Sequence, residues 1–272
     1  MLVVDVGAND GSLCYYLLKN LPLARVIAVE PNFDLHGPQF VELNEVFADR
    51  FQFAPFAISD ETGAAHLYGS QINNGQIASL LPINSNADWN KEIASKLEQD
   101  DVMQIQTLSV RDFVDTFRIK SIDFLKIDTQ GTDLDILEAF LEVLPVKLIA
   151  VEIELLAEDS QHFYQGGHNS IGRLVDLTRK YGFQIYRMIP VSGSCIEYNV
   201  FLSTDAETFS TVSEIVRLRD LPPFKRFWEV IGVGSEIEFK TSERQRALLK
   251  KIYSALWHPW ASYRSVLRKL TA

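Results

Sequence analysis

Cysteine is nearly absent from this chain, whose 272 residues include only Cys14 and Cys195. Two thiols so far apart do not form the closely spaced pairs that bind zinc or iron–sulfur clusters, and they exclude a disulfide-rich scaffold. We expect packed thiols in a reducing compartment. The start of the chain also differs from a secretory leader, because Asp5 interrupts the apolar residues. The expected location is the cytoplasm.

Long apolar runs are missing too. No stretch approaches the ~18 apolar residues that suggest a membrane-spanning helix, and we find no internal repeat or low-complexity segment. With 47% hydrophobic and 23% charged residues, the composition is that of a globular protein. A chain of this length can bury a full core, so we expect one large domain with a smaller appendage.

Positive charge is scarce over most of the chain, whose net charge is −10. This excess of acid argues against nucleic acid as a partner. The exception is residues 240–272, which hold eight lysines and arginines and a single acidic residue, Glu243. Apolar and aromatic residues are interspersed with these cations, so two interpretations stay open. The segment is either a helix packed on the domain or a peripheral contact with an anionic membrane. No feature indicates the oligomeric state.

The opening stretch carries the most information. Residues 3–6 are of strand type, a turn with Gly7, Asn9 and Gly11 follows, and residues 13–18 have helical spacing. A strand, a glycine turn and a helix form the first unit of an open parallel sheet. Ligands bind in such sheets at the carboxyl ends of the strands, where a helix N-terminus faces the opening.

A nucleoside site is predicted at this turn. The second strand, over residues 24–29, ends in Glu30, whose carboxylate can accept hydrogen bonds from both hydroxyls of a ribose. The dinucleotide fingerprint G-x-G-x-x-G needs glycine where this chain has Asn9 and Ser12. Asparagine tolerates the left-handed turn, but its side chain hinders a pyrophosphate. A nicotinamide-dependent oxidoreductase or epimerase is therefore the less favoured alternative.

S-adenosylmethionine (SAM) fits this turn better, because it has no phosphate. Asp5, at the end of the first strand, supports the choice, since a carboxylate there could hold the methionyl ammonium and would repel a phosphate. The alternative is that Asp5 and Asn9 only cap the following helix.

Prolines set two of the boundaries that follow. We predict a helix that begins at Pro38, because proline is tolerated in a first helical turn. Pro55 places the strand over residues 51–57 at a sheet edge, since proline cannot donate to a ladder. The polar residues 69–88 are interpreted as a substrate-facing loop, because long loops in compact domains are usually functional or disordered.

The remaining chain alternates strands and helices. The predicted strands cover residues 64–68, 102–110, 122–128, 146–153, 183–189 and 196–202. The predicted helices cover residues 89–99, 110–117 with Ser109 as its cap, 132–144 and 170–181. Such alternation indicates a parallel sheet with helices on both faces, and the final hairpin adds one antiparallel strand. We therefore predict the Rossmann-like, seven-stranded fold of class I SAM-dependent methyltransferases.

Several motifs now resemble one family, the FkbM-type methyltransferases. The matching segments, in family order, are residues 4–11 (VDVGANDG), 29–31 (VEP), 57–63 (AISDETG) and 124–131 (FLKIDTQG), supported by 151–154 (VEIE). The resemblance implies a methyltransferase domain over residues 1–203. Residues 204–272 lie outside it, as a C-terminal helical extension that is basic towards its end.

The resemblance implies SAM as cofactor and methyl transfer, often to a hydroxyl of a sugar, a polyketide or another secondary metabolite. By this resemblance the cofactor-binding residues are Asp5, Gly7, Ala8 and Asn9 at the methionyl part, Glu30 and Pro31 at the ribose, Ala57, Ile58 and Ser59 at the adenine, and Asp128 beside the methyl group. The chain departs from the family at Gln130, where members often have glutamate. No helix precedes the first strand, so a cover for the cofactor has to come from a longer chain or from another segment.

Methyl transfer to a hydroxyl requires that the hydroxyl lose a proton, which calls for a general base. Asp128 is the first candidate because it follows a strand at its carboxyl end, although it could instead only bind the cofactor. His168 is the alternative base. These two with Glu152 or Glu154 could also bind a divalent cation, but the spacing is not that of a metal site, and we predict none. A degenerate fold that only binds a ligand or partner also stays open, because Gln130 is neutral.

Overall fold

The structure is a computed structural model. It describes residues 1–84, 102–155, 162–191 and 196–215. The helix predicted over residues 89–99 and the basic C-terminal stretch lie outside the described residues. Within the described part, no helix is both long and apolar enough to cross a membrane.

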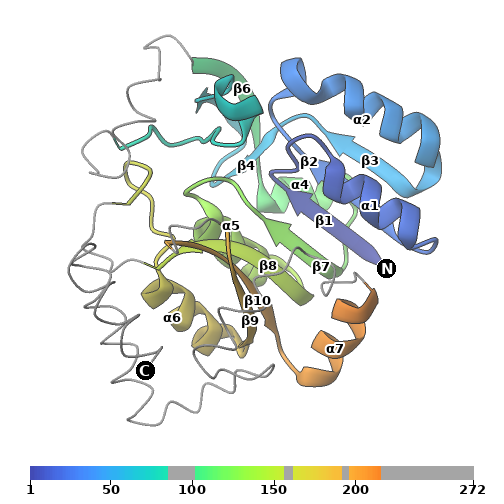
Figure 1. The fold of residues 1–272 in the computed structure, drawn as a ribbon, viewed down its shortest axis with the longest axis vertical. Coiled ribbons are helices and arrows are strands. Elements are labelled where there is room, and N and C mark those ends of the chain that lie inside the picture. Colours follow the sequence, from blue (N-terminus) through green and yellow to red (C-terminus); the bar gives the residue numbers. More distant parts are fainter. Residues whose placement is uncertain (85–101, 156–161, 192–195, 216–272) are drawn as a thin grey trace, which may run out of the picture. The chain divides into compact units, whose positions relative to one another are not determined.

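A seven-stranded sheet forms the centre of the domain, in the order β3-β2-β1-β7-β8-β10-β9 (Figure 1). Its strands are β1 (Leu2–Val6), β2 (Arg25–Val29), β3 (Phe51–Ala54), β7 (Ile122–Ile127), β8 (Val146–Glu154), β9 (Gln184–Pro190) and β10 (Glu197–Ser203). The pairs from β3 to β8 are parallel, whereas β10 is antiparallel to both of its neighbours. This confirms the predicted Rossmann-like class I methyltransferase fold with one antiparallel strand.

Helices cover both faces of this sheet. They are α1 (Ser12–Asn20), α2 (Phe33–Phe47), α4 (Val110–Phe117), α5 (Asp133–Val143), α6 (Ile171–Tyr181) and α7 (Ala206–Ile215), with short 3-10 turns η1 (Ala48–Arg50) and η2 (Ile72–Gly75). One apolar core joins side chains of α1 and α2 to the strands, and Phe209 of α7 packs against it. Consecutive contacts link α4, α5 and α6. The start of the predicted C-terminal extension, α7, thus packs on the sheet.

Burial of the inner strands explains their composition. In β1, Val3, Val4 and Val6 are at most 1% exposed, and Asp5 between them is fully buried. Parallel strands covered on both faces favour such continuous apolar runs. Two helices begin at serine caps, of which only Ser109 was predicted. The Ser109 hydroxyl accepts from Asp112 N at 3.1 Å, and the Ser170 hydroxyl accepts from Arg173 N at 3.2 Å.

A second, three-stranded sheet was not predicted. It consists of β4 (Ala57–Ser59), β6 (Val102–Ser109) and β5 (Gly63–Tyr68), in that order. The predicted single strand over residues 51–57 is therefore wrong in its extent. β3 does lie at the edge of the main sheet, but it ends before Pro55, which cannot donate to a ladder. The chain then crosses to the second sheet, where β4 pairs with β6.

The start predicted for the second helix is also wrong, because α2 begins at Phe33 and Pro38 lies inside it. The ring of Phe33 lies against Gly37, where an added Cβ would come within 2.9 Å of it. The same ring stacks on Phe53 of β3, with 5.9 Å between ring centroids. Aromatic packing of the first turn thus offsets the backbone hydrogen bond that Pro38 cannot make.

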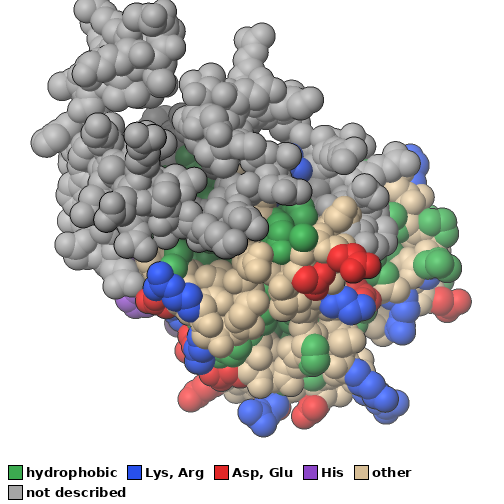
Figure 2. Space-filling model, turned by 90° about the horizontal axis from the view of Figure 1, so that it is seen from below, with side chains coloured by type: hydrophobic (Ala, Val, Ile, Leu, Met, Phe, Trp, Pro, Cys, Tyr) green, Lys and Arg blue, Asp and Glu red, His purple; other side chains and the backbone are tan. Residues whose placement is uncertain are grey.

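The surface of the described part mixes both signs of charge. On the face drawn in Figure 2, acidic and basic side chains are interspersed. Two of the exposed ion pairs are Lys180–Glu138 at 2.7 Å and Lys147–Asp123 at 2.6 Å. Pairs of this kind add little to stability. Their mixture differs from the continuous basic stripe typical of a nucleic-acid-binding face.

Candidate active site

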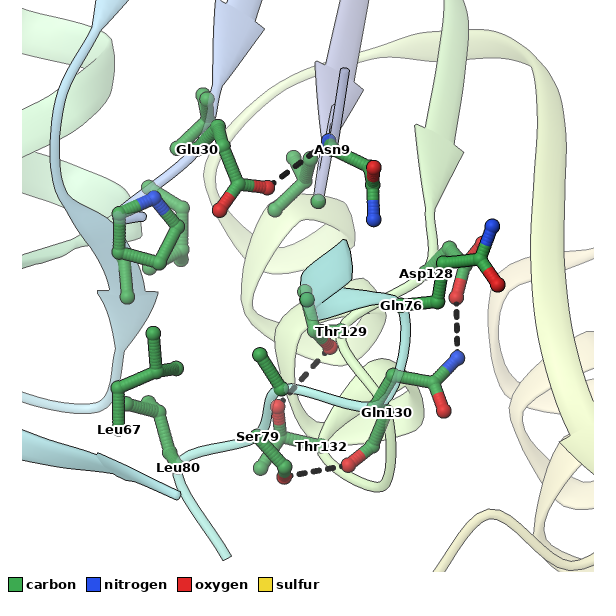
Figure 3. Close-up of a pocket in the computed structure, with 18 residues that line it drawn as sticks. Asn9, Glu30, Leu67, Gln76, Ser79, Leu80, Asp128, Thr129, Gln130 and Thr132 are labelled. Atoms are coloured by element: carbon green, nitrogen blue, oxygen red, sulfur yellow. Dashed lines mark hydrogen bonds between the residues drawn. The ribbon is translucent and has the colours of Figure 1, made fainter. Parts of the chain in front are cut away.

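One pocket lies at the carboxyl ends of β1, β2 and β7. At β1 the direction in which the sheet is built reverses, because β2 and β3 lie on one side of β1 and β7 and β8 lie on the other. This is the topological switch point at which open α/β sheets bind ligands. The pocket opens to solvent, and about 580 Å³ of space, open solvent included, lies between the residues that line it. Figure 3 shows Leu67 and Leu80 at one side of it and Asp128 and Gln130 at the other.

Most of the predicted cofactor residues meet in this pocket. Those that line it are Gly7, Asn9, Glu30, Pro31, Ala57, Ile58 and Asp128. Ala8 is 5% exposed and lies behind the turn, where its N–H donates to Val29 O at 3.0 Å. Ser59, at the end of β4, and the exposed His168 are outside the pocket lining. The structure therefore brings Asp128, and not His168, to the site as a candidate base.

The glycine turn is pressed against the end of β7. Gly7 has φ +75°, and a Cβ added to it would lie 1.8 Å from Asp128 O. Its N–H donates to Val29 O at 2.9 Å. Asn9 has φ 48°, the left-handed conformation that asparagine tolerates. Only a residue without a side chain fits at position 7.

Glu30 is held with its carboxylate at the pocket. One oxygen accepts from Asn9 N and the other from Asn32 N, both at 2.9 Å, and the first of these bonds is drawn in Figure 3. The side chain is only 7% exposed, and burial raises its pKa to about 7, against the opposing effect of the two N–H donors. Each oxygen keeps a free lone pair, so the carboxylate can accept two further hydrogen bonds.

Asp5 lies elsewhere than predicted. It is fully buried and pairs with Lys126 Nζ at 3.3 Å, while Cys14 Sγ lies 3.2 Å from its other oxygen. Burial raises its pKa, and Lys126 opposes that rise. Since Asp5 has no exposed surface, the structure corrects the prediction that it contacts the methionyl ammonium. The parallel register of β1 and β7 places it opposite Lys126, which satisfies its charge internally.

Asp128 is the carboxylate that faces the pocket, with 29% of its side chain exposed. Gln130 Nε2 donates to its Oδ1 at 2.8 Å, and Lys126 Nζ lies 3.4 Å from its Oδ2. Two groups from the protein thus fix the orientation of this side chain while its oxygens remain accessible from the pocket.

Gln130 joins two carboxylates that would otherwise repel each other. Besides Asp128, its Nε2 contacts Glu152 Oε1 at 3.2 Å, and its Oε1 accepts from the Tyr164 hydroxyl at 2.8 Å. Burial raises the pKa of Glu152 well above its usual range, and the charge of Asp128 adds to the rise. The departure from the family at this position was visible in the sequence, but this bridging role was not.

Residues 75–80, which belong to the loop interpreted as substrate-facing, form the outer wall of the pocket. Residues 75–80 border the pocket, except for Ile77. The Ser79 hydroxyl donates to Gln130 O at 2.5 Å (Figure 3). The backbones of Ser79 and Tyr68 exchange two hydrogen bonds. Sequence reasoning identified the loop but missed which residues face inward. The pocket-lining residues that the sequence did not predict are Val6, Val29, Leu67, Gly75, Gln76, Ala78, Ser79, Leu80, Thr129, Gln130 and Thr132.

The other acidic and histidine candidates have structural partners. Glu154 pairs with the buried His162 at 2.6 Å between Oε2 and Nδ1, and it also accepts from Phe163 N at 3.1 Å. Lys126 pairs with Asp5 and Asp128, and Lys147 pairs with Asp123. Among the residues that the structure describes, no group of three or more His, Cys, Asp or Glu is arranged to hold a metal ion.

Asp133 shapes the loop that carries Asp128 and Gln130. Its carboxylate accepts from Thr129 N at 2.8 Å, from Gly131 N at 3.0 Å and from the Asn169 side chain. It is fully buried, which raises its pKa to about 6, with a further contribution from the charge of Asp128.

Replacing Asp133 by alanine should lower the free energy of unfolding by about 3 kcal/mol or more, because buried donors left without acceptors each cost about 1–3 kcal/mol. Urea denaturation measures this loss. The control is Asp135→Ala on the same helix. The Asp135 side chain is 39% exposed, and its ion pair with Arg173 should contribute less than about 1 kcal/mol. Equal losses for the two variants would contradict the prediction.

The sequence of this chain is similar to those of known proteins. Residues 5–185 match the model of the family described as the methyltransferase FkbM domain. The protein Methyltransferase 1 of Beauveria bassiana is 25% identical over 149 residues, which are 50% of this chain and 56% of that protein. The AMB antimetabolite synthetase AmbE of Pseudomonas aeruginosa is 24% identical over 208 residues, which are 68% of this chain and 10% of AmbE. The chain thus spans about half the length of the first relative and a tenth of the second.

Among solved structures, the mitomycin 7-O-methyltransferase MmcR is 17% identical, with a TM-score of 0.38, over 74% of this chain and 48% of that one. The O-methyltransferase NcsB1 from neocarzinostatin biosynthesis is 15% identical, with a TM-score of 0.36, over 75% of this chain and 49% of that one.

Proposed function

Because this chain belongs to the FkbM methyltransferase family, with SAM as its methyl donor, we propose that it transfers the methyl group to a hydroxyl of a glycan or a secondary metabolite. The observation that supports this most is the placement of two carboxylates, Glu30 and Asp128, at different ends of one pocket. The first suits a ribose and the second suits an acceptor hydroxyl. The similarity to a segment of an antimetabolite synthetase supports the secondary metabolite as acceptor class.

The residues present fit SAM. Glu30 offers two accepting oxygens for the ribose hydroxyls, and Ala57, Ile58 and Leu67 provide an apolar wall for the adenine. Asn9 occupies the position where a dinucleotide site needs glycine, which disfavours a pyrophosphate. When bound, SAM supplies an electrophilic methyl group on a sulfonium, so the protein has mainly to bind, orient and exclude water.

Asp128 is proposed to take the proton of the acceptor hydroxyl. Its side chain is a hydrogen-bond acceptor that reaches the pocket, and it is oriented from two sides by Gln130 Nε2 and Lys126 Nζ. The Asp128 carboxylate would accept the hydroxyl proton while the oxygen–methyl bond forms and the methyl–sulfur bond breaks, which would leave S-adenosylhomocysteine. A positioned base of this kind contributes about 10²–10⁴-fold to a rate.

Isothermal titration with S-adenosylhomocysteine, the demethylated cofactor, tests the site. We expect saturable binding by the wild type and weaker binding, by roughly 10- to 100-fold, for Glu30→Gln, since a hydrogen bond to a charged group contributes about 1.5–3 kcal/mol. Absence of heat at millimolar ligand, or binding of a nicotinamide dinucleotide instead, would contradict the proposed function.

The pH dependence of binding gives a second test of Glu30. With a pKa of about 7 in the free protein, Glu30 is charged above that pH and protonated below it. Affinity for 5′-methylthioadenosine, which has no ionisable amino-acid part, should be constant above about pH 7 and fall as the pH drops below it. Titrations of wild type and Glu30→Gln across this range measure the effect, and an equal pH dependence in both would assign it to another group.

A further inference from the structure

Lys126 connects three parts of the site that are far apart in the sequence. It lies on β7, directly opposite Asp5 of β1 in the parallel register. Its Nζ is 2.7 Å from Gly7 O, 3.3 Å from Asp5 Oδ1 and 3.4 Å from Asp128 Oδ2. The ammonium donates a hydrogen bond to Gly7 O, and the Asp5 and Asp128 carboxylates lie at ion-pair distance from it. The first strand, the glycine turn and the end of β7 therefore meet at one side chain.

The charge of Lys126 is maintained by its neighbours. Burial by itself lowers the pKa of this ammonium, but the carboxylates of Asp128 and Asp5 outweigh that effect and raise it. The side chain is 17% exposed. Because Asp5 is fully buried, its carboxylate takes no contact from outside and serves to hold Lys126 in place. The remaining donors of Lys126 act on Gly7 and Asp128, which both line the pocket.

The glycine turn has one anchor on each side. Towards β2, the N–H groups of Gly7 and Ala8 donate to Val29 O, and Asn9 N donates to Glu30. Towards β7, the Gly7 carbonyl accepts from Lys126, and β1 pairs with β7 through the backbone. The ribose half of the pocket thus depends on bonds that Lys126 does not make. The half between the turn and Asp128 depends on Lys126.

We propose that Lys126 is a positioning residue for the methionyl and methyl half of the SAM site. It holds the Gly7 carbonyl and the Asp128 carboxylate at a set separation, with buried Asp5 as its internal counter-charge. This inference rests on the proposed function, because it assigns that half of the pocket to the amino-acid end of SAM.

Two ligands separate the halves of the site. S-adenosylhomocysteine occupies both, whereas 5′-methylthioadenosine carries the nucleoside and the thioether but no amino acid. The informative variant is the double substitution Asp5→Asn with Lys126→Met, which removes one charge of each sign and so leaves no buried carboxylate unpaired. Lys126→Met alone should melt at a lower temperature than this double variant, because it leaves the buried charge of Asp5 without a counter-charge. Lys147→Met, which removes the exposed ion pair with Asp123, is the matched control.

For the double variant we expect the affinity for S-adenosylhomocysteine to fall about tenfold or more, while that for 5′-methylthioadenosine stays within about twofold of the wild type. Lys147→Met should leave both affinities unchanged. A merely structural role of Lys126 predicts equal losses for the two ligands, and that result, or no loss for either, would overturn the inference. Equal melting temperatures for the single and double variants would overturn the pairing with Asp5. Failure of the wild type to bind either ligand would instead contradict the proposed function.

Discussion

Substitution of Gly7 by alanine should abolish the binding of S-adenosylhomocysteine. Gly7 has φ +75°, and its Cβ would lie 1.8 Å from Asp128 O, which is a backbone atom. A flexible side chain could move away from such a contact, but a carbonyl at the end of a central strand cannot move without disrupting the ladder between β1 and β7. The turn would have to shift, and with it Asn9 N, which holds Glu30.

We expect the affinity for the demethylated cofactor to fall by at least about 100-fold, which corresponds to about 2.7 kcal/mol. Isothermal titration measures the affinity, and circular dichroism shows whether the variant folds. Gly182→Ala is the matched control, since Gly182 also has positive φ, at +75°, but nothing lies within 4 Å of its added Cβ. That variant carries only the penalty for the left-handed backbone, about 1 kcal/mol of stability, and should bind normally. Normal binding by Gly7→Ala would refute the packing argument.

The second large effect is expected for Asp128→Asn, which should lower kcat by about 10²–10⁴-fold, the usual contribution of a general base. Asparagine keeps the shape of the side chain and an oxygen that can accept from Gln130 Nε2, but it cannot take up a proton. Binding of S-adenosylhomocysteine should therefore change by no more than a few-fold. The effect falls on the chemical step and spares the fold.

The measurement is transfer of labelled methyl from SAM to a panel of sugar and phenolic hydroxyls, followed by kinetics on the acceptor that reacts. Asp123→Asn provides the control, because Asp123 lies on the same strand and pairs with Lys147 at the opposite end of it. Retention of full activity by Asp128→Asn would mean that Asp128 only orients the loop. Binding of the cofactor without turnover on any acceptor would favour the alternative of a degenerate, ligand-binding fold.

Local patterns explain why the first half of the site could be predicted. The strand, the turn and Glu30 lie within one short βαβ unit, where residue type and spacing report directly on structure. Asn9 and Glu30 are 21 positions apart, and their hydrogen bond follows from that unit alone. The helix cap at Ser109 was predicted for the same reason, because the cap involves a residue three positions away.

Errors occurred where the outcome depends on more distant packing. Stacking of Phe33 on Phe53 decides where α2 begins. β3 ends where it does because the chain after Pro55 joins the second sheet. Propensity rules weigh each proline by itself, so they cannot include these contacts. The side chains that close the pocket from residues 75–80 are likewise positioned by bonds to Gln130 and Tyr68.

The amino-acid sequence by itself determined the class of fold, the family and the pocket-lining residues of the first turn and of Glu30, because those depend on alternating elements and on motifs of a few consecutive residues. Only the tertiary structure decided which carboxylate faces the ligand. Asp5 lies one residue before the end of β1 and Asp128 directly follows β7, and sequence spacing treats them alike. The parallel register of β1 and β7 sets Lys126 opposite Asp5, and the charge of a buried aspartate has to be satisfied by a neighbour. That long-range pairing withdraws Asp5 from the pocket and leaves Asp128 as the aspartate that lines it.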